Sequence, residues 1–147
     1  MFVMWQCKIY NAIWAFGFHF CVERIDNKRR THDCGVIASF QQESQSSARD
    51  RNPITGDIEY VGTIQNIYDV SFGESGHYFL FDVKWFKVVC RGPNATVKSD
   101  PSGFFAIDSS KTLSMESFDT LVLPRHCEQV HMLCCHVFRF IASDFSI

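Results

Sequence analysis

The chain has 147 residues, a formal charge of −2, 46% apolar residues and fifteen phenylalanines. This length suits a single domain, and so apolar a composition excludes an intrinsically disordered chain. The slight negative charge argues against a general nucleic-acid binder, because such domains usually carry an excess of Lys and Arg. Aromatic and β-branched residues are common in strands, so the composition favours β structure.

The N-terminal region begins without a clear pattern. Residues 1–15 show no clean hydrophobic period, so no regular element is predicted there. The apolar start lacks a charged leading region and a small-residue cleavage site, and Lys8 and Asn11 interrupt it, which argues against a signal peptide. No run is long and apolar enough to predict a membrane-spanning helix. Alternation from Phe18 predicts a first strand, and residues 35–40 predict a second.

The middle of the chain gives the strongest β signal. Residues 41–57 are polar and rich in Ser and Gln, and they predict a long exposed loop. Apolar alternation then predicts two strands, residues 58–73 and 77–89, joined by a GESG turn into an antiparallel hairpin. Gly62 predicts a bend or a bulge in the first of these strands.

The C-terminal region adds two strand candidates, residues 103–108 and residues 119–133, the second interrupted by Pro124. Helical periodicity is absent throughout. Several short strands around one dominant hairpin predict a mostly β, small, antiparallel and partly open barrel-like domain with irregular termini.

The stretch HCEQVHMLCCH, residues 126–136, is rich in possible metal ligands. In an extended strand, Cys127 and His131 share one face, whereas Cys134 and His136 share the other, so the four cannot surround one ion. No second ligand pair and no signature of a cysteine nucleophile accompany them. The sequence therefore predicts no metal, no cofactor and no catalytic residue. The odd, irregularly spaced set of seven cysteines predicts a reducing compartment, nuclear or cytoplasmic, and not a secreted protein.

Two groups of residues are candidates for binding. Trp85 has the period of the core-facing residues, whereas Phe86 falls on the opposite face of its strand and could join a tyrosine on an exposed aromatic surface. That surface would consist of Tyr60, Tyr68 and Phe86. Direct DNA binding would use the basic residues Lys28, Arg29, Arg30, Arg49 and Arg51. Flanking aspartates make the 28–30 run look more like a solvated turn.

Several blocks resemble a known family in order and spacing. They are DRNPITGDIEYVGTIQNI, FLFDVKWF, VKSDPSGFFAID and DTLVLPRHCEQV. They are similar to the plant family called domain of unknown function 4216, over about residues 16–130. Residues 1–15 and 131–147 do not match it, which predicts an N-terminal extension, a β domain and a C-terminal tail. The resemblance implies a protein derived from a CACTA-type (En/Spm-like) transposon, in which this domain usually follows a transposase-like domain.

The resemblance implies a context more than a mechanism, because no activity is established for the family. The expected function is a non-catalytic accessory or interaction domain that binds protein or chromatin, with no membrane and no small-molecule substrate. The strand order is also similar, by analogy, to bromo-adjacent homology and Tudor-like barrels. Two alternatives stay open: a DNA-binding accessory module of a transposase, and a truncated gene copy with no present activity.

Overall fold

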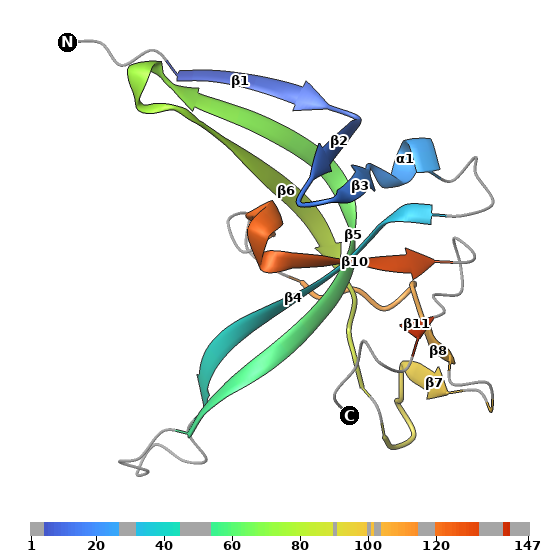
Figure 1. The fold of residues 1–147 in the computed structure, drawn as a ribbon. Helices are drawn as coiled ribbons and strands as arrows, with labels where there is room; N and C mark the ends of the chain where they lie inside the picture. Colours follow the sequence, from blue (N-terminus) through green and yellow to red (C-terminus); the bar gives the residue numbers. More distant parts are fainter. Residues whose placement is uncertain are drawn as a thin grey trace.

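The structure of the chain, a computed structural model, is described for residues 5–26, 32–44, 54–89, 91–99, 101, 104–114, 120–132 and 140–141. It is a mostly β protein whose largest sheet curls into an antiparallel half-barrel (Figure 1). The predicted fold class is therefore confirmed. The described helices are α1 (Glu23–Asp26) and the 3-10 turns η1 (Gly73–Ser75) and η2 (Pro124–His126). None of these is long and apolar enough to cross a membrane.

The largest sheet contains six strands. Their order is β10-β4-β5-β6-β9, and β1 pairs with the far end of β5. Their bounds are β1 (Trp5–Tyr10), β4 (His32–Ser44), β5 (Ile54–Phe72), β6 (His77–Trp85), β9 (Leu121–Val122) and β10 (Cys127–Met132). Two smaller sheets accompany it. They are β2 (Ala12–Ala15) with β3 (Phe18–Cys21), and β7 (Val97–Ser99) with β8 (Phe104–Ile107) and β11 (Phe140–Ile141).

β5 is the spine of the large sheet. Its 19 residues span roughly 60 Å at the usual rise of a strand. β4 pairs with one edge of β5 as far as Thr63, and β1 pairs with the same edge from Ile67 onward. β6 pairs along the opposite edge, where Gln65 is an extra residue in β5. A bulge bends and twists a strand, which explains how β5 turns from its β4 partner toward its β1 partner (Figure 1).

Gly62 has a different role from the predicted one. The bulge lies at Gln65 and not at Gly62. A Cβ atom at Gly62 would overlap the carbonyl oxygen of Lys84 and would lie 2.6 Å from Val83 Cγ1. The backbones of β5 and β6 therefore approach too closely here for any side chain, which is a reason for glycine in a strand interior.

The curled sheet has a core cluster on each face. Successive side chains of a strand point to opposite sides, so one strand contributes residues to both clusters. The larger core cluster comprises Phe20, Val22, Val36, Ala38, Ile64, Ile67, Phe81, Val83, Trp85, Val122 and Cys127. The smaller one, on the other face, comprises Cys34, Ile37, Val61, Phe86, Ile107 and Val130. β3 covers the larger cluster through Phe20, and β8 covers the smaller one through Ile107. The predicted period of the 77–89 strand is confirmed, since Phe81, Val83 and Trp85 share one face.

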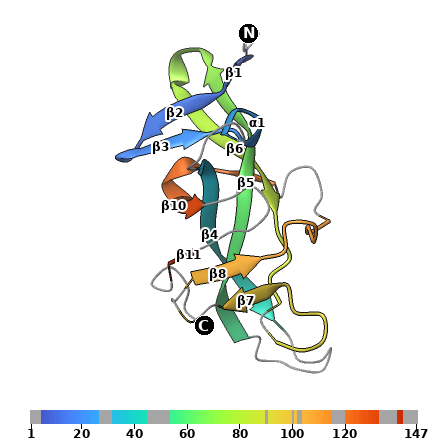
Figure 2. The same cartoon turned by 90° about the vertical axis from the view of Figure 1, so that its right-hand side faces the viewer.

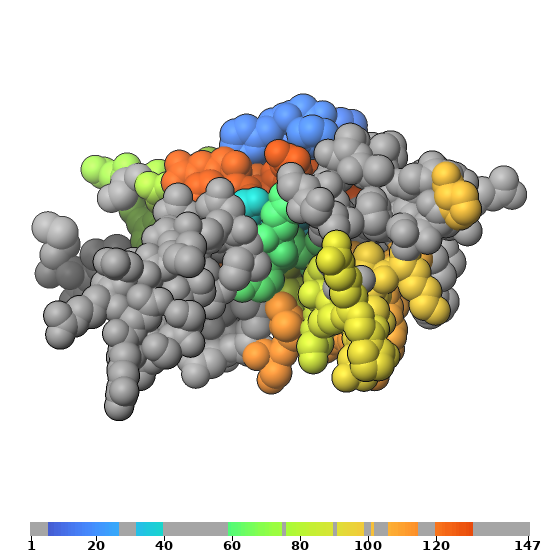
Figure 3. All heavy atoms as spheres, turned by 90° about the horizontal axis from the view of Figure 1, so that it is seen from below, coloured from blue at the N-terminus to red at the C-terminus, as the bar shows by residue number. Residues whose placement is uncertain are grey.

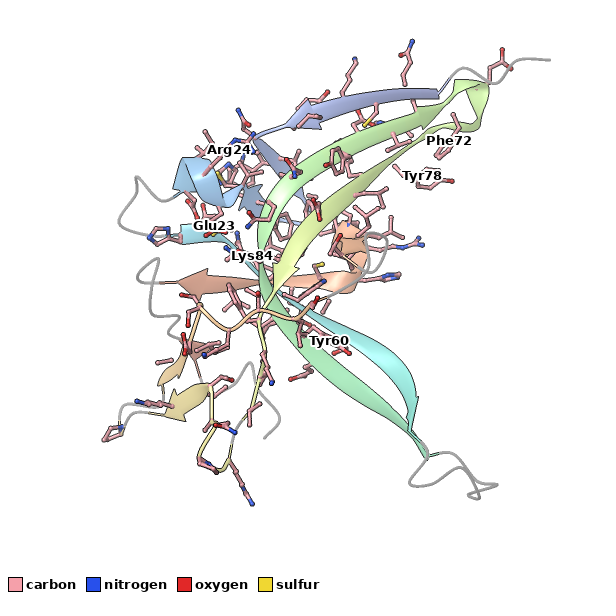
Figure 4. The ribbon with its side chains drawn as sticks, turned by 180° about the vertical axis from the view of Figure 1, so that it is seen from behind. Glu23, Arg24, Tyr60, Phe72, Tyr78 and Lys84 are labelled. Atoms are coloured by element: carbon pink, nitrogen blue, oxygen red, sulfur yellow. The ribbon has the colours of Figure 1, made fainter. Side chains whose placement is uncertain are left out.

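α1 lies beside the gap that β4 and β1 leave next to the bulge. Glu23 Oε2 accepts hydrogen bonds from Thr63 Oγ1 at 2.8 Å and from Gln65 Nε2, and it lies 3.1 Å from Lys84 Nζ. Figure 4 shows Glu23 and Lys84 on this part of the sheet. Burial alone raises the pKa of Glu23, but the hydrogen bonds from Gln65 and Thr63 and the charge of Lys84 outweigh it. The pKa of Glu23 is therefore lower than its usual value, and the carboxylate holds the bulge to α1.

Two segments are more regular than the sequence predicts. No element is predicted for residues 1–15, but β1 and β2 form there and pair with β5 and β3. The predicted loop at residues 41–57 is wrong at both ends, because residues 41–44 pair with residues 54–57. Residues 45–53 lie outside the described part of the chain. Strands with polar side chains give no hydrophobic alternation. Their pairing is made by backbone hydrogen bonds, which need no apolar face.

Candidate functional site

The three aromatic residues of the predicted binding surface are not brought together. Phe86 is only 1% exposed and packs in the smaller core cluster. Tyr60 is half-buried on the opposite face, with its ring centroid 6.0 Å from that of Trp85. Tyr68 pairs with Leu80, which lies roughly 20 Å along β6 from Phe86. The predicted surface does not form, which weakens the idea of a chromatin reader built on it.

The predicted DNA contacts all lie outside the described residues. They are Lys28, Arg29, Arg30, Arg49 and Arg51. The β4–β5 ribbon that leads toward the last two extends away from the rest of the sheet (Figure 1). Its strands, residues 39–44 and 54–60, contain Glu43, Asp57 and Glu59 and no Lys or Arg. Acidic residues repel phosphates, so this ribbon gives no support to DNA binding.

The stretch rich in cysteine and histidine is described only in part. Residues 133–136 lie outside the described residues, and the earlier ones form η2 and β10. Cys127 and Val130 are core residues, and burial raises the pKa of the Cys127 thiol to about 12. Within the described ranges, no group of three or more His, Cys, Asp or Glu side chains could hold a metal ion.

One acid, histidine and cysteine do meet at the start of β4. Asp26 Oδ2 accepts a hydrogen bond from the backbone N–H of Cys34 at 2.9 Å and lies 3.7 Å from His32 Nδ1. All three residues are at least 96% buried. Burial and then the charge of Asp26 raise the pKa of the Cys34 thiol far above its usual value. A buried, protonated thiol is a poor nucleophile, so the group anchors α1 to β4.

The free edge of β6 is the first component of a different candidate site. Val83 N–H donates to the Thr120 carbonyl at 3.0 Å, and Phe81 pairs with Val122. Continuing this register would place Pro124 opposite Phe79. Proline has no N–H to donate, and Pro124 begins η2, so β9 ends before it covers the rest of β6. In the described structure, no strand pairs with this edge of residues 77–80.

A groove lies along this free edge. We call it the β6-edge groove, and it is lined by Ala15, Phe16, His77, Tyr78, Phe79, Leu123, Pro124 and Arg125. Its volume is about 290 Å³, slightly below the ~300–1,000 Å³ of typical small-molecule pockets. The lining is mostly apolar and aromatic. The groove therefore suits one large apolar side chain of a partner better than a separate small molecule.

The β2–β3 hairpin supplies one wall of the groove. It projects from the side of the sheet (Figure 2), and its strand β3 contacts β10, where the side chain of Gln129 donates to the His19 carbonyl. In Figure 3 these segments, blue and orange, lie side by side. The two-residue turn has positive φ at both positions, 51° at Phe16 and 81° at Gly17. A turn of this type prefers Asn-Gly, so Phe16 occupies a position that disfavours it.

The hairpin also displays aromatic side chains. Phe16 is 70% exposed, Trp14 78% and Phe18 43%, and Tyr78 on β6 is 53% exposed. The ring of Tyr78 lies edge-on to that of Phe72, with centroids 5.9 Å apart. Figure 4 shows this pair at one end of the sheet, far from Tyr60. Large aromatic side chains gathered at the surface of a soluble protein often mark an interaction site.

Arg125 is the cationic residue of the groove lining. Arg125 is exposed in η2, and no carboxylate of the described chain forms an ion pair with it. Glu59 and Glu128 line a neighbouring hollow with Arg125 but do not pair with it. The imidazole of His77 also lines the groove, and its Nδ1 lies 3.0 Å from Asp69 Oδ1. Arg125 is thus available to a carboxylate from outside.

Sequence reasoning identified none of the residues of this groove as functional. Two signals were present: the interruption at Pro124, and an aromatic residue immediately before Gly17. Neither shows which strand edge remains open or that the hairpin lies beside it. Those facts depend on pairings between segments that are far apart in the sequence.

No family model, curated protein or solved structure matches the chain. The resemblance to the plant family therefore stays a prediction, and function has to be inferred from the groove and its surroundings.

Proposed function

We propose that this chain is a non-catalytic interaction domain that binds a segment of a partner protein at the β6-edge groove. The observation that carries the proposal is Phe16, an aromatic residue with φ 51° and 70% exposure. A left-handed conformation costs an ordinary residue about 1–2 kcal/mol, and exposure gives no burial in return. Local rules of this kind are most often broken where a residue serves function.

The surroundings of Phe16 support the same function. Trp14, Phe18 and Tyr78 are exposed on the hairpin and the neighbouring strand. Aromatic residues contribute much of the binding energy at protein interfaces, because they bury a large area with few rotatable bonds. The groove has the size of a single side chain, which fits a partner segment that inserts one apolar anchor.

The family resemblance suggests the setting. It implies a transposon-derived, transposase-associated protein, in which an accessory domain would hold another protein of the same complex. We therefore propose protein binding in preference to DNA binding. The acidic β4–β5 ribbon and the overall charge of −2 both favour this choice.

The first experiment is thermal unfolding followed by tryptophan fluorescence. A single cooperative transition is expected, because two core clusters hold the large sheet on both faces. A flat trace would contradict the proposal and favour the truncated gene copy with no present activity.

The second experiment selects peptides from a random phage-displayed library on the purified chain and measures their affinity. Replacing Phe16 with Asn should weaken binding at least about tenfold, a change of ~1.4 kcal/mol. The Asn-Gly turn suits the hairpin, so this variant keeps its fold. Ile9→Ser is the matched control, because Ile9 is 62% exposed but lies on β1, away from the groove. Equal binding by the Phe16→Asn variant and the wild type would refute the proposal.

A further inference from the structure

We propose that the partner segment is an extended peptide that adds to the free edge of β6 as a strand and pairs a carboxylate with Arg125. This inference rests on the proposed function and gives it a binding mode. Three features of the structure support this binding mode: the open backbone groups of β6, the apolar β6-edge groove beside them, and Arg125 in the groove lining. Each feature is visible in the described structure.

The backbone groups of the edge come first. In an antiparallel strand, alternate residues direct both their N–H and C=O groups to the same edge. Gly76 directs its carbonyl toward β5, where it accepts from Phe72 N–H at 3.1 Å, whereas Val83 donates toward β9. His77 and Phe79 have the parity of Val83, so their backbone groups face the open edge. No described backbone group pairs with them there.

Such an edge is normally protected. Proteins block exposed strand edges with Lys, Pro, bulges or a covering segment, because an open edge templates pairing with another chain. The edge at residues 77–80 has the sequence HYFL, which contains neither Lys nor Pro. The bulge of the hairpin lies in β5 and not in β6. The edge is therefore competent for strand addition, a common mode of peptide recognition.

The groove supplies side-chain selectivity. A strand added beside His77 and Phe79 would run between β6 and η2, in line with β9. Its side chains would alternate, so every second one would face Phe16, Leu123 and Pro124. A groove of about 290 Å³ accepts one large apolar side chain. We therefore expect a single aromatic or aliphatic anchor.

Arg125 supplies charge selectivity. It lines the groove, is exposed and forms no ion pair with a described carboxylate. His126, also exposed, follows it in η2. A guanidinium in the lining of an apolar groove favours a carboxylate, which it can bind through two parallel hydrogen bonds. An acidic residue close to the anchor completes the proposed motif.

A second copy of this chain is a poorer occupant. The open edge is four residues long, about 13 Å, and stable protein interfaces bury roughly 1,200–2,000 Å² in total. Pairing of two such edges would bury much less than that. A peptide needs only the edge, one anchor and one charge, so the area favours a peptide.

The test uses acetylated peptides of about seven residues, with Val and Thr at most positions. Phe, Tyr, Leu or Trp occupies the centre, and Glu or Lys stands two positions later. Fluorescence anisotropy measures their affinity for the full chain. Glu peptides should bind at least about tenfold more tightly than Lys peptides, and Arg125→Glu should reverse that order. Arg91→Glu is the matched control, because Arg91 is exposed, does not line the groove and gives the same change in net charge.

N-methylation of the best peptide tests strand addition directly. It removes one backbone N–H and leaves every side chain in place. Alternate positions should lose at least about tenfold in affinity and the positions between them little, because only every second N–H faces β6. A uniform response would overturn strand addition, as would a library in which no member binds. Phage-selected peptides that depend on Phe16 would leave the proposed function standing in either case.

Discussion

Phe81 and Trp85, in the second half of β6, are at most 2% exposed, whereas Tyr78, in the first half, is 53% exposed. The second half has a neighbour on each edge, β5 on one side and β9 or residues 112–113 on the other. The first half pairs with β5 alone among the described segments. The two halves of β6 therefore differ: the second half packs into the core, and the first half faces solvent.

The comparison separates stability from binding within a single strand. Substitutions in the covered half should destabilise the fold, because its side chains belong to the larger core cluster. Substitutions in the open half should leave the fold intact and change only what the groove binds. The two effects can therefore be measured independently.

The largest effect is expected for Phe81→Ala in the covered half. Phe81 is fully buried, and its ring lies 4.9 Å from that of Phe20. Removing it should lower the free energy of unfolding by about 3–5 kcal/mol, through lost burial and a cavity. Tyr78→Ala, in the open half, should lower it by less than about 1 kcal/mol. Urea denaturation of both variants measures this, and equal losses would erase the distinction between the two halves.

Gly62→Ala should have the next largest effect. The added Cβ meets the Lys84 carbonyl oxygen, so the backbones must separate. We expect a loss of about 1–3 kcal/mol in the free energy of unfolding. The double variant Gly62→Ala/Val83→Ala removes the second contact at 2.6 Å but leaves the carbonyl in place. The double variant should therefore not regain the stability of the wild type. Full recovery would show that the Val83 side chain, and not the Lys84 carbonyl, excludes a side chain at position 62.

Glu23→Gln should change how stability depends on pH. The pKa of Glu23 is lower in the folded chain than its ordinary value of 4.5. Its contribution is therefore fully present above pH 4.5 and is lost as the pH falls through the folded pKa. The variant should be less stable than the wild type by roughly 1 kcal/mol at neutral pH, and the difference should vanish in acid. Denaturation at pH 7 and at a series of progressively lower pH values tests this, and a difference that stays constant over the whole series would refute it.

Phe16→Asn should have the smallest effect on stability, and the opposite sign. Asn tolerates positive φ, so the variant should gain up to about 1 kcal/mol in the free energy of unfolding while losing peptide binding. Thermal unfolding and anisotropy on the same sample measure both. A destabilised variant would contradict this prediction, because it would mean that Phe16 stabilises the fold and that its positive φ does not lower stability.

The fold was largely accessible from the sequence, and the groove was not. Alternation predicted the β5–β6 hairpin and the burial of Phe81, Val83 and Trp85, because the period of a strand is a local property. The same alternation placed Phe86 correctly on the opposite face but wrongly at the surface. Whether that face is covered depends on Ile107 and Val130, which come from distant segments.

The sequence by itself determined a mostly β domain, its central hairpin and the alternating face of that hairpin, since these depend on neighbouring residues. Only the tertiary structure decided which edge of β6 stays open and that the hairpin carrying Phe16 lies beside it. It also decided that β1 joins the sheet and that the β4–β5 ribbon begins where a loop is predicted. The physical reason is that backbone groups pair without regard to side-chain type. Pairing partners are therefore chosen by the whole fold and leave little trace in any one segment.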